Sequence, residues 1–476
     1  MKDLAQVDAA ASGAAAQSGI AGETGNLAQS CPKVTLEIGV FFDGTLNNRF
    51  NVMNPDKREG QDSYFNALSN PALLFDVYKN GPAHDERNSC GGVDRAFRSI
   101  YVQGPGSVQG EDDDNMGYAL GQGQRSGVES RVLWGFRQVL RQIRQMGGVP
   151  ALRKVVLDVF GFSRGAAAAR YFVNCIRAGT VRYDPVGPGD FTENLPAGLT
   201  VEIRFLGIFD TVAAIGKADN DDNAPVNVHL KTAQVTGQIY HLTASDEYRR
   251  NFRLNRNTPG GGDSFALPGA HSDVGGGYLD NGDDAQLGKE RRRSFPTRAE
   301  AEAEQAATRA ADQTSAENRA TERVFIREGW LNANETEGGV RHVLGPITQV
   351  RSRDWRGRDK ISFAYDEQLM LHRPWVRAGL SRIALRMMHE AALGHVNGAF
   401  LDLPPTTNYT VPDGLQPYEA EIRAGTLTGA NRRAVLRGWG HVSAKDGPYA
   451  SAEWIGHRAD TNRQRTTYPN QTSEAI

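Results

Sequence analysis

The sequence predicts an α/β fold with a mostly parallel central sheet, because strand-like and helix-like segments alternate along it. Residues 34–42 (VTLEIGVFF) and 201–209 (VEIRFLGIF) have strand composition. Residues 154–160 (KVVLDVF) indicate a buried strand, and a short turn connects them to the helical segment 166–176 (AAAARYFVNCI), whose small residues allow close packing on a sheet. Strand, turn and helix in immediate succession are typical of βαβ units.

Three further elements complete the predicted core. Apolar residues recur at helical spacing over 128–146, and Gly147 and Gly148 end that helix. Residues 264–268 (SFALP) predict a weaker strand, and residues 383–393 (IALRMMHEAAL) predict a return to core helix. We therefore expect the catalytic core to extend over residues 34–403.

Three stretches differ in composition from this core. Residues 1–32 are small and polar without a helical or strand period, so we expect a flexible leader. Residues 281–328 are rich in Ala, Glu, Arg and Gln and predict a solvated helical insertion, with a lid or partner-docking arm as the alternative. Residues 404–476 are rich in Pro, Asn and Arg and predict a loop-rich C-terminal extension.

The composition excludes several classes of protein. Fifty-four Lys and Arg against 56 Asp and Glu give a net charge of −2, which disfavours binding to nucleic acid. No stretch approaches the ~20 apolar residues of a membrane-spanning helix. The three cysteines have no CxxC spacing, which argues against a disulfide scaffold or a cysteine-rich zinc site. The first 30 residues lack the basic start and apolar segment of a signal peptide, so we expect synthesis in the cytoplasm and, where secretion occurs, another export route.

The segment GFSRG at residues 161–165 carries the chemistry. It matches the GxSxG pattern between a strand and a helix, where Gly161 and Gly165 let the two elements approach at a sharp, strained turn that presents Ser163. The N-terminal N–H groups of the helix that begins at Arg164 favour a developing negative charge nearby. The alternative is a structural glycine-rich turn with an incidental serine; the strand–turn–helix context favours Ser163 as a nucleophile.

A serine nucleophile needs a histidine base and a carboxylate that orients the histidine. In α/β-hydrolases these follow the serine in the order acid, then histidine, each on a loop after a strand. Asp210 directly follows the strand 201–209, although it could also cap the next helix. His271 lies between a short strand and a glycine run and is the candidate base. The competing residues are His241 and His389 as base and Asp273 as orienting carboxylate.

Ester hydrolysis also needs backbone donors for the oxyanion, each worth roughly 3–4 kcal/mol. We expect the N–H groups of Arg164 and Gly44 to supply them, the latter from a loop after the first strand. Asp43 has two alternative roles, cation binding or a hydrogen bond within its loop. The acidic cluster at residues 112–114 lacks the spacing of a calcium-binding loop. We expect neither a metal ligand set nor a cofactor.

Five sequence landmarks occur in the order found in a known family. They are residues 41–48 (FFDGTLNN), 161–166 (GFSRGA), 209–212 (FDTV), 246–252 (DEYRRNF) and 269–278 (GAHSDVGGGY). The chain thereby resembles the first family of GxSxG lipase effectors of bacterial type VI secretion systems, over roughly residues 34–280. The resemblance implies an α/β-hydrolase fold and phospholipase activity, with cleavage at position sn-2 (A2) favoured and cleavage at sn-1 (A1) as the alternative. It also implies Ser163 as nucleophile, Asp210 as orienter and His271 as base.

The same resemblance implies an antibacterial effector with several partners. These are a membrane phospholipid substrate, a secretion spike or adaptor protein and a cognate immunity protein, with action in the periplasm or at the membrane of target cells. Two rival functions stay open: an intracellular esterase acting on small or carbohydrate esters, and a non-catalytic, hydrolase-like secretion adaptor. An enzyme is favoured because nucleophile, acid and base occur in hydrolase order at loop positions, which a scaffold does not need.

Overall fold

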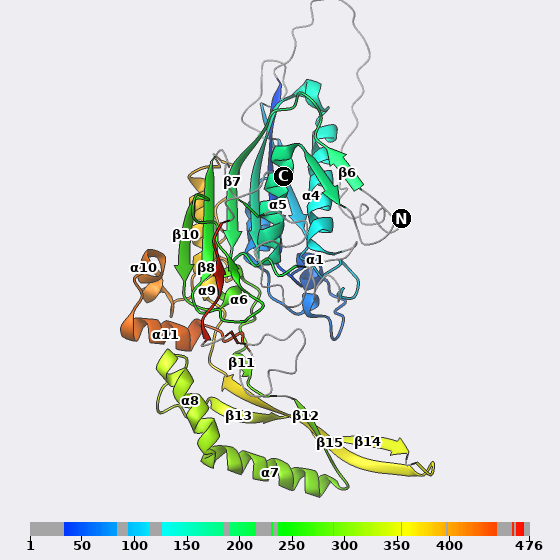
Figure 1. Ribbon diagram of the computed structural model, residues 1–476, viewed down its shortest axis with the longest axis vertical. Coiled ribbons are helices and arrows are strands. Elements are labelled where there is room, and N and C mark those ends of the chain that lie inside the picture. Colours follow the sequence, from blue (N-terminus) through cyan, green and yellow to red (C-terminus); the bar gives the residue numbers. More distant parts are fainter. Residues whose placement is uncertain are drawn as a thin grey trace, which may run out of the picture.

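A computed structural model describes most of the chain (Figure 1). The described residues are 33–82, 94–114, 126–183, 191–215, 230–231, 237–288, 290–353, 355–396, 398–444, 459–460 and 463–470. The leader expected at residues 1–32 lies outside them. Within the described part, no helix combines the length and the apolar character needed to cross a bilayer.

A seven-stranded sheet forms the centre of the molecule. Its strand order is β10-β8-β7-β4-β1-β3-β2, and all neighbours are parallel except the short edge strand β2. The strands are β1 (Val34–Phe42), β2 (Gly81–Pro82), β3 (Arg95–Val102), β4 (Leu152–Phe162), β7 (Val201–Phe209), β8 (Gln238–Ala244) and β10 (Asp263–Leu267). The predicted α/β class with a mostly parallel sheet is therefore confirmed.

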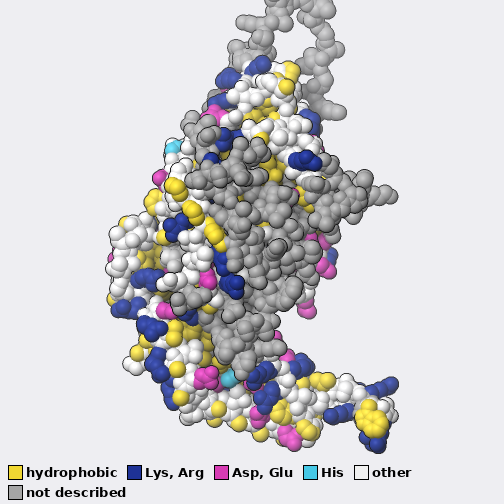
Figure 2. Space-filling view, in the orientation of Figure 1, with side chains coloured by type: hydrophobic (Ala, Val, Ile, Leu, Met, Phe, Trp, Pro, Cys, Tyr) yellow, Lys and Arg dark blue, Asp and Glu magenta, His cyan; other side chains and the backbone are white. Residues whose placement is uncertain are grey.

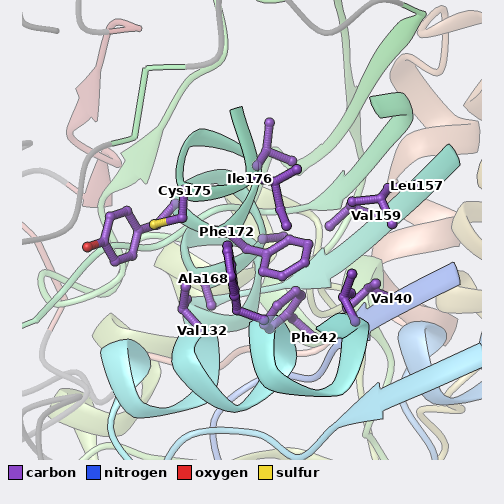
Figure 3. Close-up of a cluster of buried hydrophobic side chains, with 14 of the residues drawn as sticks. Val40, Phe42, Val132, Leu157, Val159, Ala168, Phe172, Cys175 and Ile176 are labelled. Atoms are coloured by element: carbon purple, nitrogen blue, oxygen red, sulfur yellow. The ribbon is translucent and has the colours of Figure 1, made fainter. Parts of the chain in front are cut away.

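Helices cover both faces of this sheet. On one face α4 (Val128–Gln145) and α5 (Arg164–Ala178) pack on the inner strands, as the side chains in Figure 3 show. On the other face lie α2 (Asn70–Val77) and α9 (Leu380–Leu393). Successive residues of β1 serve opposite faces, since Phe42 belongs to the first cluster and Phe41 to the second. Burial on both faces explains the continuous apolar composition of the inner strands.

The insertion after residue 281 contains a second sheet. Its two helices, α7 (Arg298–Thr314) and α8 (Ala316–Glu328), lie where the sequence predicts them, but the unit continues to residue 373 as an antiparallel sheet around β15. The strands are β11 (Asp283–Gln286), β12 (Arg291–Phe295), β13 (Gly339–Leu344), β14 (Thr348–Arg353) and β15 (Asp359–Arg373). Among them, β12 and β14 are polar and largely exposed, so they lack the apolar pattern that reveals a buried strand.

The C-terminal part also has more regular structure than the loop-rich extension that its composition suggests. It contains α10 (Gln416–Ala424), α11 (Gly429–Trp439) and β16 (Thr467–Tyr468), which pairs with β9 (Leu254–Asn255). Few apolar residues mark these helices; α11 buries Val435 and Leu436. The remaining short elements are α1 (Arg49–Met53), α6 (His271–Gly275), β5 (Thr180–Tyr183), β6 (Phe191–Asn194) and two 3-10 turns at Asp62–Tyr64 and Val149–Ala151.

Candidate active site

Ser163 occupies a strained turn between β4 and α5. Its φ of 59° and ψ of −129° lie in a region that residues with a side chain rarely adopt. The turn fits because its flanking residues are glycines. A Cβ at Gly161 would lie 2.5 Å from the carbonyl oxygen of Gly165, and one at Gly165 would lie 2.1 Å from the carbonyl oxygen of Asp43. Close packing of β4, α5 and the loop after β1 therefore holds Ser163 at the carboxyl edge of the sheet.

His271 and Asp210 form a buried pair at the same edge of the sheet. Asp210 follows β7 with a φ of 42°, and His271 is the first residue of α6. The Nδ1 atom of His271 lies 2.5 Å from Oδ2 of Asp210, while its Nε2 atom is buried without a hydrogen-bond partner in the described part of the chain. Ser163 and His271 line one pocket of about 470 Å³. The arrangement leaves Nε2 available to a group inside that pocket.

Electrostatics keep this pair in the form that a base requires. Burial alone would raise the pKa of Asp210, but Arg465 and His271 outweigh it and hold the pKa well below its usual range. Burial lowers the pKa of His271, which outweighs the opposing effect of Asp210. At neutral pH the carboxylate is thus charged and the imidazole neutral, with Nε2 able to accept a proton.

The competing residues have other partners. His241 contacts the Thr211 N–H and Asn257 Oδ1, and burial lowers its pKa to about 3. His389 contacts the carbonyl oxygen of Leu401. Asp273 pairs with His441 rather than His271, with 2.7 Å between Oδ1 and the imidazole Nδ1. The structure thus brings together Ser163, Asp210 and His271 and places the three competitors in separate hydrogen-bond networks.

The expected oxyanion donor Gly44 is not directed to the pocket. Its N–H donates to Oδ1 of Asp43 at 2.7 Å, and the same carboxylate accepts from Ser69 Oγ and Tyr101 OH, both at 2.5 Å. This buried carboxylate needs several donors, and Gly44 is the one next to it in the sequence. Asp43 consequently fastens its own loop, the second of the two roles considered for it. Burial, opposed by these hydrogen bonds, raises the pKa of Asp43 to about 6.

Two other residues bring the loop after β1 and the start of α5 to the pocket. Thr45 and Arg164 both line it, and the Arg164 Nε–H donates to Thr45 Oγ1 at 2.7 Å. The Thr45 N–H has no hydrogen-bond acceptor among the described residues. Thr45, one residue beyond Gly44, therefore lines the pocket together with Leu46 and Asn47 of the same loop.

The acidic cluster at residues 112–114 serves as a set of hydrogen-bond acceptors and ion-pair partners. Asp112 pairs with Arg58, Asp113 accepts from the Ser63 N–H, and Asp114 accepts from Ser126 Oγ. Across the residues that the structure describes, no group of three or more His, Cys, Asp or Glu side chains is arranged to hold a metal ion.

Arg465, which was not among the expected site residues, contacts Asp210 directly. Its guanidinium donates to Oδ1 and Oδ2 of Asp210 at 2.7 and 2.8 Å, and its Nε–H donates to the carbonyl oxygen of Phe252. Arg465 lies in a polar tail without a motif, so no sequence signal marks it. Pairing of β16 with β9 brings this part of the tail to the site.

Glu247 and Arg249 were not expected as site residues either, although both lie in the landmark at residues 246–252. Glu247 Oε2 accepts from the His271 N–H at 3.2 Å and from Ser443 Oγ at 2.8 Å. Arg249 pairs with Glu247 and lines the pocket. The ring of Phe252 contacts the His271 imidazole edge-on at 4.9 Å. These residues hold the start of α6 and the orientation of the imidazole.

A mostly parallel sheet with a serine on a strained strand-to-helix turn defines an α/β-hydrolase. Residues 190–298 match the family model described as "T6SS, Phospholipase effector Tle1-like, catalytic domain", and the match includes Asp210 and His271. This result confirms the family resemblance drawn from the motifs.

Solved structures that resemble the chain include the following two. One is described as "Structure of the Tle1 effector bound to the VgrG spike from the Type 6 secretion system"; it is 22% identical, with 96% of this chain and 98% of that chain covered and a TM-score of 0.57. The other is an uncharacterized protein from Pseudomonas aeruginosa, 25% identical over 52% of this chain and 42% of that chain, with a TM-score of 0.34. No curated protein matches the sequence.

Proposed function

We propose that the chain is a phospholipase that hydrolyses acyl esters of membrane phospholipids through an acyl-enzyme on Ser163. The observation that carries the proposal is the strained Ser163 turn sharing one pocket with the His271–Asp210 pair. Ser163 and His271 line the same pocket and Asp210 contacts His271, and a serine hydroxyl is activated by residues of these three types. The match to a phospholipase effector family supports the class of substrate.

In the proposed mechanism, Ser163 Oγ attacks the ester carbonyl while His271 Nε2 takes the hydroxyl proton. Asp210 holds the imidazole and stabilises its charged form. The tetrahedral intermediate collapses, His271 gives its proton to the leaving lysophospholipid oxygen, and an acyl-enzyme remains. Water then attacks the acyl-enzyme with His271 as base, which releases the fatty acid and restores Ser163.

The oxyanion of each tetrahedral intermediate needs two N–H donors. We assign these to Arg164 and, in place of Gly44, to Thr45. Arg164 is the first residue of α5, whose N-terminal end favours negative charge. Thr45 is supported by its position in the pocket wall and by its N–H, which has no other acceptor among the described residues.

The pocket combines the two chemistries of a phospholipid. Arg164 carries a positive charge that suits a phosphodiester, while apolar side chains offer a surface for an acyl chain. The apolar members of the lining are Leu46, Phe162, Phe252, Met370 and Val442. We propose A2 activity first and A1 activity as its alternative.

We also propose delivery by a type VI secretion system, with a spike protein as carrier and an immunity protein that protects the producer. The fold similarity to a Tle1 effector bound to a VgrG spike supports the carrier. In this proposal the substrate is met in the envelope of a target cell, in its periplasm or at its membrane.

The test compares the native chain with Ser163→Ala on a phospholipid whose two acyl chains carry different isotopes. Mass spectrometry of the products should show release of one labelled fatty acid by the native chain and none by the variant. A fluorophosphonate probe should label the native chain at Ser163. Absence of labelling would support the adaptor, and hydrolysis of soluble short-chain esters alone would support the small-ester esterase.

A further inference from the structure

The hairpin of β14 and β15 ends in an exposed apolar tip. Trp355 lies in the turn between the two strands with 85% of its surface exposed, and Ile361 on β15 is 52% exposed. The hairpin extends away from the body of the molecule at one end of the second sheet (Figure 1). In the space-filling view, hydrophobic atoms gather at that end beside Lys and Arg side chains (Figure 2).

Folding gives no reason for this exposure. A tryptophan is usually highly buried, and an isolated two-stranded ribbon is marginally stable in water. The insertion has its own apolar cluster around Phe325 and Leu371, to which neither Trp355 nor Ile361 belongs. An apolar tip that does not serve the core is explained by a partner that covers it.

The charge near the tip indicates the chemistry of that partner. Residues 348–361 contain five basic residues and two acidic ones, Asp354 and Asp359, which gives 5 − 2 = +3 in a chain whose total is −2. The basic residues are Arg351, Arg353, Arg356, Arg358 and Lys360. The Arg356 guanidinium stacks over the Trp355 ring at 4.3 Å. Tryptophan with surrounding Arg and Lys suits the interface of an anionic bilayer, where the ring enters the headgroup layer and the cations meet lipid phosphates.

The part of the second sheet next to the hairpin, where β12 pairs with β15, contrasts with the tip. There Arg292 pairs with Asp366, and Arg293 pairs with Glu304 and Glu367, so basic and acidic side chains balance. The excess positive charge is thus confined to the end that carries Trp355. This separation favours attraction of the tip, rather than of the whole insertion, to a negative surface.

One continuous strand connects the tip to the pocket. β15 begins beside the tip, and its residues Gln368 and Met370 line the pocket that contains Ser163. From Ile361 to Gln368 an extended strand advances about 23 Å. Attachment of the tip to a bilayer therefore keeps the pocket within a few tens of ångströms of the lipid.

We propose that the tip formed by Trp355, Ile361 and the surrounding basic residues anchors the protein to an anionic phospholipid surface. The proposal rests on the proposed phospholipase function, because it supplies the surface from which the substrate is taken. It differs from that function in assigning bilayer attachment to residues remote from Ser163.

Attachment is measured by sedimentation with vesicles, in a Ser163→Ala background so that no lipid is hydrolysed. We expect the full chain to bind vesicles rich in phosphatidylglycerol more tightly than vesicles of phosphatidylcholine. The double variant Trp355→Ser, Ile361→Ser should bind the anionic vesicles on the order of tenfold more weakly. Leu401→Ser removes a half-exposed apolar side chain that lies outside the second sheet. It is the matched control and should bind like the parent chain.

Hydrolysis assays with Ser163 intact separate the two proposals. The double tip variant should lose activity on vesicles but keep full activity on a soluble short-chain ester. Equal vesicle binding by the tip variant and the Leu401→Ser control would overturn the anchor. The same result is expected if the tip binds a protein partner instead of lipid. Vesicle binding through the tip by a chain that hydrolyses no phospholipid would instead retain the anchor and refute the proposed function.

Discussion

Arg465 donates hydrogen bonds to both carboxylate oxygens of Asp210, at 2.7 and 2.8 Å. The same carboxylate contacts Nδ1 of His271 and accepts from the Ala244 N–H. Asp210 is therefore fixed in place before it orients His271. The guanidinium also keeps this fully buried carboxylate charged, as its lowered pKa indicates. Arg465 is thus a positioning residue that acts on the pocket through Asp210 and His271.

Arg465→Met should lower kcat/KM by about 100-fold, because Asp210 loses the two bonds that fix its position. Without the guanidinium, more of the charge of Asp210 acts on the imidazolium, so the pKa of His271 should rise. The acidic limb of the pH profile of kcat/KM should then move to higher pH. Rates measured across pH test this.

The free energy of unfolding should also fall, by roughly 3–5 kcal/mol, because one member of a buried ion pair is removed. Arg465→Lys keeps the charge and should recover part of the activity. Arg463→Met is the matched control, since Arg463 pairs with Glu328 rather than Asp210. An Arg463 variant as defective as the Arg465 variant would show that the segment, not the guanidinium on Asp210, matters.

Asp210→Asn should reduce kcat by about 10⁴-fold with little change in fold, because the amide favours the wrong tautomer of His271. In the native chain, burial places the pKa of His271 below its ordinary value. A base with a lowered pKa stays neutral at lower pH, so the acidic limb of kcat/KM should fall below about 6.5. A limb clearly above that value would contradict the assignment of His271 as base.

Gly161→Ala should destabilise the protein by roughly 1–3 kcal/mol, because the new Cβ would lie 2.5 Å from the Gly165 carbonyl oxygen. Chemical denaturation measures this change. Gly438→Ala is the matched control, since a Cβ there meets nothing within 4 Å and alanine favours the helix. Equal destabilisation by the two substitutions would refute the close approach at the Ser163 turn.

Tyr101→Phe should destabilise the protein by roughly 1–3 kcal/mol at pH 7.5 and by less at pH 5. The Tyr101 hydroxyl donates to Asp43, whose pKa is raised to about 6, so the carboxyl is mostly charged only at the higher pH. Removal of this donor matters most for the charged form. Unfolding by urea at both pH values measures it.

The matched control for this pH dependence is Tyr64→Phe. The Tyr64 hydroxyl donates to the carbonyl oxygen of Glu111, which does not titrate. The loss of unfolding free energy caused by Tyr64→Phe should therefore be nearly the same at pH 5 and pH 7.5. A Tyr101 variant with the same pH-independent loss would show that Asp43 does not titrate in this range.

The sequence predicts the parts of the fold that obey local rules. Buried parallel strands are continuously apolar, which reveals β1, β4 and β7, and the glycines around Ser163 mark a turn that few other residues allow. Because the carboxyl ends of parallel strands share one edge, Asp210 after β7 could be expected near Ser163. Its contact with His271 agrees with the sequence prediction, although the catalytic roles remain predictions.

The remaining features depend on contacts that composition does not encode. In the second sheet, β12 and β14 are polar and largely exposed, so no apolar pattern marks them in the sequence. Gly44 is a reasonable oxyanion donor until the carboxylate of Asp43 competes for its N–H. Arg465 approaches Asp210 across 255 positions, a distance over which no spacing rule operates.

That separation along the chain bears on how the protein is made. A ribosome that has just added Asp210 must still translate 255 positions before Arg465 is available. At about 5–20 residues per second this takes roughly 13–50 s. During that interval the nascent polypeptide contains Ser163 and gains His271. Asp210, however, still lacks its hydrogen bonds from Arg465. A cell that synthesises this protein therefore carries unfinished copies in which Asp210 has no hydrogen bonds from Arg465, and truncated products that end before Arg465 share that loss.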